Sequence, residues 1–275
     1  MAKISNDERR KYIEKIKKYK AVAAALLSRE KTVLTEIKKD PDGAVLKRFS
    51  LVDEMLNLAS NYIIIDGVSR STLKVKNEDA LNDGRKSLYK SLIYLEETVS
   101  TLVDAPLSEY QEKLAAIETV SAAQRYLLIR KMGLAIRLLE DAYGYNTKWK
   151  WAFVELEGRF AAAAKNIIDL RNALVNSDPH SPNYEPTVYH LRLIKKLLAQ
   201  AADRYREKYE LSTGRIDDFK QGMAFLSALR RLYLLLGDRE EAETVKKKLE
   251  IWSVKLETDL KKQEEMYQKK AGISP

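Results

Sequence analysis

The chain has little of what most catalytic sites are built from. Its 275 residues include no cysteine, two histidines, ten glycines and six prolines. The absence of cysteine excludes disulfides, zinc-thiolate sites and cysteine nucleophiles. The sequence also lacks a glycine-rich phosphate loop and a metal-ligand cluster. We therefore predict a protein that is not an enzyme and that has no cofactor and no bound metal.

Long apolar segments are missing as well. The longest apolar run, from Ala21 to Leu27, is far shorter than the roughly 20 residues that a membrane-spanning helix needs. The N-terminus is polar and lacks the apolar core of a signal peptide. These features predict a soluble, cytoplasmic protein without a transmembrane segment.

What the chain has in quantity is helix-forming sequence. Apolar residues make up 45% of the chain and charged residues 32%, a composition typical of long helices. Apolar residues recur with helical rather than strand-like spacing. The spacing predicts an all-α fold, a helical bundle or solenoid-like array, with about nine helices near 7–39, 45–65, 77–103, 109–118, 122–143, 147–175, 187–211, 217–236 and 239–270.

The first helix carries a heptad seam. Seven apolar residues follow one another in alternating four- and three-residue steps, with Glu30 filling the one gap: Tyr12, Ile16, Tyr19, Ala23, Leu26, Val33 and Ile37. Such a seam is typical of helices that pair side by side. The pairing can be within the chain or between chains, so the sequence allows a homo-oligomer through the first helix.

Turn residues divide the helices into a hairpin and a body. The turn 40–43, Asp-Pro-Asp-Gly, breaks the chain between two helices, and a tight turn between helices makes them antiparallel neighbours. Residues 1–66 are therefore predicted to form an N-terminal helical hairpin, and residues 77–275 a helical body. The segment 67–76 is the predicted linker.

Capping signals mark where several helices begin. One of Ser5, Asn6 and Asp7 is the expected N-cap of the first helix, and Asn77 that of the third. Two patterns of serine followed three residues later by glutamine predict capping boxes: Ser108 with Gln111, and Ser121 with Gln124.

The last two predicted helices resemble a tetratricopeptide (TPR) repeat over about residues 223–251. The residues that carry the resemblance are Leu226, Leu229, Tyr233, Gly237, Ala242 and Leu249. Gly237 stands at the turn of the motif and Ala242 at the close contact between its helices. Arg230 departs from the pattern at a small-residue position, and Val254 stands where a terminating proline is common. The resemblance implies a protein-binding scaffold, whereas an ordinary helical hairpin is the alternative.

A shorter segment resembles the signature of the HEPN family of helical ribonucleases. It runs from Arg171 and Asn172 to Asn176. The family places a histidine four to six residues beyond the arginine, where this chain has Asn176, and His180 lies nine residues beyond Arg171. A histidine is the group that would transfer a proton near neutral pH. The resemblance therefore implies at most a degenerate ribonuclease.

Two parts of the chain are candidates for binding a partner. A basic stretch in the first helix includes Arg9, Arg10, Lys11, Lys15 and Lys18, and it could bind nucleic-acid phosphates or an anionic surface. A solvated helix face is the alternative. Trp149 and Trp151 lie two positions apart at a helix start and point about 200° apart, so that one could be core and the other an exposed aromatic anchor.

These features favour a non-enzymatic scaffold or assembly component that binds another protein. The net charge of +9 and the sequence pI of about 9.3 keep open a nucleic-acid-binding protein that uses the basic helix. The same charge also fits an ordinary basic soluble protein.

Overall fold

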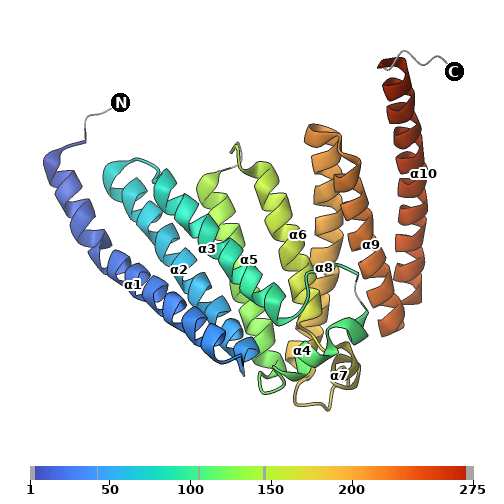
Figure 1. Cartoon of the computed structure of the whole chain (residues 1–275), viewed down its shortest axis with the longest axis horizontal. Coiled ribbons are helices and arrows are strands. Elements are labelled where there is room, and N and C mark those ends of the chain that lie inside the picture. The colour runs from blue at the N-terminus through green and yellow to red at the C-terminus, as the bar shows by residue number, and fades with distance from the viewer. Residues whose placement is uncertain (1–3, 42, 105, 145–146, 271–275) are drawn as a thin grey trace. The chain divides into compact units, whose positions relative to one another are not determined.

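The protein is built from helices. Its computed structural model describes residues 4–41, 43–104, 106–144 and 147–270. Within these residues there are ten α-helices and no β-strand, so the all-α prediction is confirmed (Figure 1). The helices are α1 (Asn6–Lys39), α2 (Ala44–Leu73), α3 (Glu78–Thr98), α4 (Gln111–Ala115), α5 (Ala122–Tyr143), α6 (Lys150–Asn166), α7 (Leu170–Val175), α8 (Tyr184–Lys208), α9 (Ile216–Leu236) and α10 (Arg239–Lys270). None of the described helices combines the length and apolar character needed to span a membrane.

The chain divides into two compact units. Residues 1–101 and 106–189 form the first, and residues 102–105 and 190–275 form the second. In the first unit α1 packs on α2, α2 on α3 and α5, and α6 on α3 and α5. In the second unit α9 and α10 form a hairpin. This division differs from the predicted one, since residues 1–66 belong to the same unit as residues 77–101 and 106–189.

The segment predicted as a linker is mostly helix, so that prediction was wrong. Helix α2 continues through Gly67 to Leu73, and only a short turn leads into α3. The buried carboxylate of Asp66 explains the continuation. It accepts hydrogen bonds from the backbone N–H of Asn77 (2.7 Å) and from Nε of Arg70 (2.6 Å). Arg70 also donates to the backbone carbonyl of Ala142, which ties the end of α2 to the end of α5.

Two other boundaries also differ from the sequence prediction. The helix expected over 147–175 is two helices, because the Asp169 side chain accepts from the backbone N–H groups of Arg171 and Asn172 and starts α7 anew. The third helix ends at Thr98 rather than near residue 103.

The predictions of helix caps are partly confirmed and partly wrong. The Ser121–Gln124 capping box is confirmed, as are the caps at Ser5 and Asn77. The box expected at Ser108 is wrong, since the residues that precede α4 form a 3-10 turn, Leu107–Glu109, and no side chain caps α4.

The heptad seam of α1 pairs within the chain. Ile16, Ala23, Glu30 and Ile37 are its buried positions, each seven residues from the next. Ile16 packs in a cluster with Ile65 of α2 and Ala80 of α3. The buried positions of the seam therefore pack within the chain, and a homo-oligomer through the first helix remains a prediction.

Two further buried carboxylates join helices of the first unit. Glu30 accepts hydrogen bonds from Nζ of Lys90 (2.7 Å) and from the hydroxyl of Tyr94 (2.5 Å), and both partners belong to α3. Glu96 of α3 accepts two hydrogen bonds from the guanidinium of Arg159 on α6, at 2.8 and 2.5 Å. Because a buried charge needs such partners, each pair fixes the register of its two helices.

The helix–turn–helix that resembles a TPR repeat is present in the second unit. Gly237 ends α9 in the left-handed conformation (φ 80°), which glycine adopts without strain. Leu226, Leu229 and Ala242 are buried. Helix α10 runs on past Val254 to Lys270. That this hairpin is a TPR-like repeat, and that it binds a protein, both remain predictions.

A hydrogen bond from Tyr209 lowers the pKa of Asp259. The Tyr209 hydroxyl donates to Asp259 (2.8 Å), and the ammonium group of Lys255 lies 3.2 Å from the same oxygen. We expect Tyr209→Phe to raise the pKa of Asp259, which carboxyl NMR over a pH titration would measure. A depressed carboxyl pKa stabilises the fold above the pKa of the unfolded chain, and this stability is lost as the pH falls through the folded pKa.

The same variant should therefore lower the free energy of unfolding at neutral pH, by about 1 kcal/mol, and change it little in strong acid. Lys255→Met, which removes the weaker of the two interactions, is the comparison. An unchanged pKa in Tyr209→Phe would contradict the assignment.

Candidate protein-interaction surface

Helix α5 buries one face in the first unit. Its inward residues pack against α2, α3 and α6, and they are Leu128, Ile129, Met132, Ala135, Ile136, Leu139 and Tyr143. Gly133 allows the closest approach to α6, since a Cβ at this position would lie 3.2 Å from the Phe160 ring. These contacts fix α5 rigidly, and with it the orientation of its other face.

The opposite face of α5 carries leucines. Leu127, Leu134 and Leu138 are 57%, 59% and 45% exposed. They are spaced seven and four residues apart, which places them on one stripe of the helix. Single exposed leucines are ordinary on protein surfaces, but a row of large apolar side chains marks candidate interaction sites.

A lysine within the same stripe is turned toward α2. Nζ of Lys131 donates to Oδ1 of Asp53 (2.6 Å) and to Oδ1 of Asn57 (2.8 Å). The charge of Lys131 is thereby compensated by a neighbouring carboxylate. The hydrogen bonds also hold α5 against α2 in a fixed register.

Helix α2 adds one apolar side chain to this region. Ile64 is exposed and follows Asn57 by seven residues, so it shares the helix face that binds Lys131. Two hydrogen bonds join α2 and α5: one between Asn57 and Lys131, and one between Arg70 and Ala142. The residue numbers increase in the same direction along both helices, so α2 and α5 are parallel. Ile64 of α2 and Leu138 of α5 lie between these two hydrogen bonds. We name Ile64, Leu127, Leu134 and Leu138 the α2–α5 surface.

The α2–α5 surface offers apolar area to a binding partner. Its exposed members are apolar, and covering apolar area is favourable by about 25 cal/mol per Å². Among the described residues, no group of three histidine, aspartate or glutamate side chains is placed to hold a metal ion. The geometry of this surface can therefore hold an apolar partner segment.

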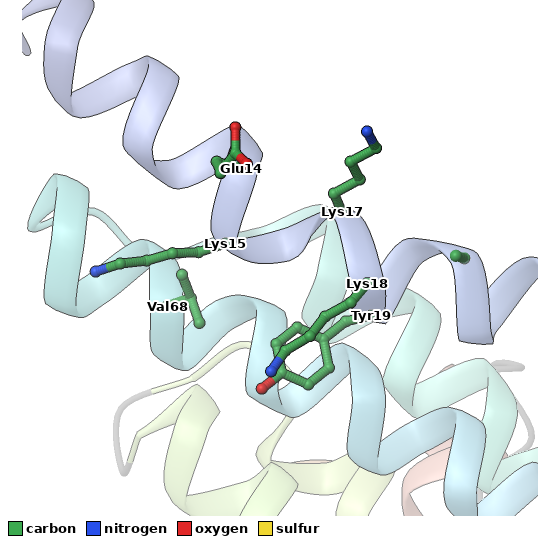
Figure 2. Close-up of a pocket in the computed structure, with 7 residues that line it drawn as sticks. Glu14, Lys15, Lys17, Lys18, Tyr19 and Val68 are labelled. Carbon is green, nitrogen blue, oxygen red and sulfur yellow. The ribbon is translucent and has the colours of Figure 1, made fainter.

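The basic residues predicted as a binding site lie along the outer side of α1. Arg9, Arg10, Lys11, Lys15 and Lys18 are all exposed. An open hollow of about 620 Å³ lies beside them, lined by Glu14, Lys15, Lys17, Lys18, Tyr19, Ala21 and Val68 (Figure 2). Figure 2 shows Lys15 extending past Val68 and Lys18 crossing the ring of Tyr19, with Nζ of Lys18 4.9 Å from the ring centroid.

The two tryptophans at the start of α6 are both half-buried. The guanidinium of Arg85 lies 4.0 Å from the ring centroid of Trp149, and Tyr143 meets the same ring edge-on. Trp149 thus anchors α6 to α3 and α5. Trp151 contacts Nζ of Lys150, 4.6 Å from its ring centroid. Neither indole is a freely exposed anchor, and a role of Trp149 or Trp151 in partner binding remains a prediction.

The HEPN-like segment is not arranged around a histidine. Arg171 and Asn172 are exposed at the start of α7, where the Asn172 amide donates to the Asp169 carboxylate (2.9 Å). His180 is exposed and bonded to Asp178, whereas His190 is buried.

Comparison with known proteins places nearly the whole chain in one family. The sequence matches the TP0443 family over residues 8–260. The chain belongs to the TP0443 family. No curated protein and no solved structure matches it. The matched residues of this TP0443 family member include the α2–α5 surface and nearly all of α1.

Sequence reasoning on this TP0443 family member missed the α2–α5 surface. The signal was present in α5, which has apolar residues at 127, 134 and 138 in addition to a complete buried face. A helix that is apolar on more than one face is expected either to be buried all round or to contact a partner. The contribution of Ile64 could not be seen in the sequence, because it depends on the packing of α2 against α5.

Proposed function

We propose that the protein is a non-catalytic component of a protein assembly and that it binds a partner protein through the α2–α5 surface. The observation that carries the proposal is the row of exposed leucines on a helix that is otherwise fixed by packing. The centres of protein interfaces are apolar and depleted in charge. The four apolar side chains of the surface fit this description, and the lysine between the leucines, Lys131, is paired with Asp53.

A partner that fits this surface presents apolar side chains in a row, as an amphipathic helix does. A rigid surface favours such binding, because little conformational entropy is lost on the side of this chain. The buried positions of the α1 seam pack against α2 and α3, so the proposed interface does not include them. A second copy of the chain, bound through the α2–α5 surface, is the competing arrangement.

The proposal predicts that Leu134→Lys/Leu138→Lys abolishes partner recovery. Tagged protein would be used to capture partners from native cytosol, with nuclease and a high-salt wash. Two lysines at the centre of an apolar interface should reduce recovery at least about tenfold. Circular dichroism of the variant should match that of the wild type, since both positions are exposed.

The matched control is Leu234→Lys/Leu235→Lys on α9, where both leucines are also about half exposed. It adds the same charge to the other unit and should leave recovery unchanged. Equal loss in both variants would contradict the proposal. Sedimentation of purified protein distinguishes a different partner protein from a second copy of the chain. If the wild type is a dimer and Leu134→Lys/Leu138→Lys is a monomer, the partner is a second copy.

A further inference from the structure

The net positive charge of the chain is concentrated in α1. Eleven of the 49 Lys and Arg residues and five of the 40 Asp and Glu residues lie in this helix. It therefore carries a net charge of +6, against +9 for the whole chain. Its first seven cations are all exposed: Arg9, Arg10, Lys11, Lys15, Lys17, Lys18 and Lys20. A local excess of this kind attracts polyanions.

The acidic side chains of α1 compensate only part of this charge. Asp7 lies 2.6 Å from Nζ of Lys11 and 3.7 Å from the guanidinium of Arg10. Within the described residues, three of the cations have no side-chain ion pair, hydrogen bond or ring contact: Arg9, Lys17 and Lys20. Lys15 and Lys18 have no described carboxylate partner either, but Lys15 donates to the Thr72 hydroxyl and Lys18 lies over the Tyr19 ring. Arg9, Lys17 and Lys20 are available to an external anion without breaking an existing pair.

The apolar side of α1 is not available to a membrane. A basic amphipathic helix binds a bilayer by burying its apolar face among the acyl chains. Here Tyr12, Ile16 and Tyr19 pack against α2 and the start of α3, and the Tyr12 hydroxyl accepts a hydrogen bond from the Asn77 amide (2.8 Å). Only Ile13 is a large apolar side chain exposed among the cations. This arrangement favours phosphates over lipid.

The basic face also presents no fully exposed aromatic ring on which a base could stack. Single-stranded nucleic acids are held by exposed aromatic rings, and the two tyrosines of this segment, Tyr12 and Tyr19, are packed against α2 and α3. The cations from Arg9 to Lys20 extend over about 16 Å of helix, a length that matches about five phosphates of one duplex strand. Contacts of this type position a protein without sequence preference.

We propose that the basic face of α1 binds the phosphate backbone of double-stranded nucleic acid, independently of base sequence. This inference goes beyond the proposed partner binding and uses a different surface. Leu134→Lys/Leu138→Lys should therefore leave duplex binding unchanged or slightly strengthen it.

The test is fluorescence anisotropy of the full chain with a labelled duplex of about 20 base pairs in about 50 mM salt. Lys17→Glu/Lys20→Glu should weaken binding at least about tenfold and should reduce the slope of log affinity against log salt by about two. Scrambling the duplex sequence should leave the affinity unchanged.

The control for net charge is Lys247→Glu/Lys261→Glu, which reverses two exposed lysines of α10. It lowers the charge of the chain equally and should change affinity less than about twofold, because these two lysines are not part of the basic face of α1 and net charge alone acts weakly through salt screening. Equal weakening by both variants overturns the inference, and so does absence of duplex binding at low salt. Binding to phosphatidylserine vesicles or to single strands in preference to the duplex also overturns it.

Discussion

Replacing Glu30 with alanine should destabilise the first unit by about 3 kcal/mol, which is large for a single substitution. Glu30 is 3% exposed and interrupts an otherwise apolar seam. Its removal leaves the hydroxyl of Tyr94 without an acceptor in a buried position and frees Lys90 from its only described carboxylate partner. It also leaves a space in the seam that alanine does not fill. Chemical denaturation followed by circular dichroism would measure the loss.

Glu36→Ala is the control for this prediction. Glu36 lies on the same helix but is exposed, so its removal should change the free energy of unfolding by less than about 0.5 kcal/mol. Glu30→Gln keeps an acceptor for Tyr94, so its free energy of unfolding should lie between those of Glu30→Ala and Glu36→Ala. If Glu30→Ala and Glu36→Ala were equally stable, the buried pair would contribute nothing to the packing of α1.

The titration of Tyr94 gives a second measurement on the same variant. Burial and the hydrogen bond to Glu30 raise the pKa of this phenol. Glu30→Ala should lower it, and ultraviolet absorbance during an alkaline titration would detect the change. A general loss of helix would shift many tyrosines together, whereas the loss of this one contact shifts Tyr94 alone.

Glu30 also shows how far the sequence determines the fold. The seam of α1 could be predicted because it depends on residue spacing within one helix, and so could the caps at Ser5, Asn77 and Ser121. Glu30 was visible as the one gap in the seam. Its partners on α3 were not, because they are about 60 residues away and depend on how α1 crosses α2 and α3.

The errors have a similar origin. Gly67 and the serines that follow it have low helix propensity, and they predicted a linker. The buried pairing of Asp66 with Arg70 and Asn77 overrides that local preference. The opposite error was made after α6, where one continuous helix was predicted. The Asp169 side chain is a helix N-cap, and this local feature is enough to begin the new helix α7.

The two candidate surfaces differ in whether they depend on one helix alone or on the packing of two helices. The basic residues of α1 are exposed because they lie outside its buried seam. A surface helix that buries one stripe of residues exposes the others to solvent. The α2–α5 surface depends on which helix packs beside α5, and periodicity alone does not reveal a neighbour. A single sequence therefore located the charged candidate site and missed the apolar one.

Replacing Gly222 with valine should destabilise the second unit by about 3 kcal/mol or more. A Cβ at this position would lie 3.0 Å from the carbonyl oxygen of Ala202 on α8 and 3.2 Å from the ring of Trp252 on α10. Both distances are shorter than ordinary van der Waals contacts, and the carbonyl belongs to a helix backbone that cannot rotate away. Valine adds two methyl groups beyond this Cβ, so α8, α9 and α10 would have to separate.

Gly67→Val is the matched substitution, since Gly67 also lies inside a helix and a Cβ there meets nothing within 4 Å. Valine has a slightly higher helix propensity than glycine, so this variant should be as stable as the wild type or more stable by about 0.3 kcal/mol. Trp252 is the only tryptophan of the second unit, and a change in its fluorescence with Trp149 and Trp151 unaffected would locate the damage there. Equal stability of the two variants would mean that glycine at 222 is not required for the approach of α8 to α9.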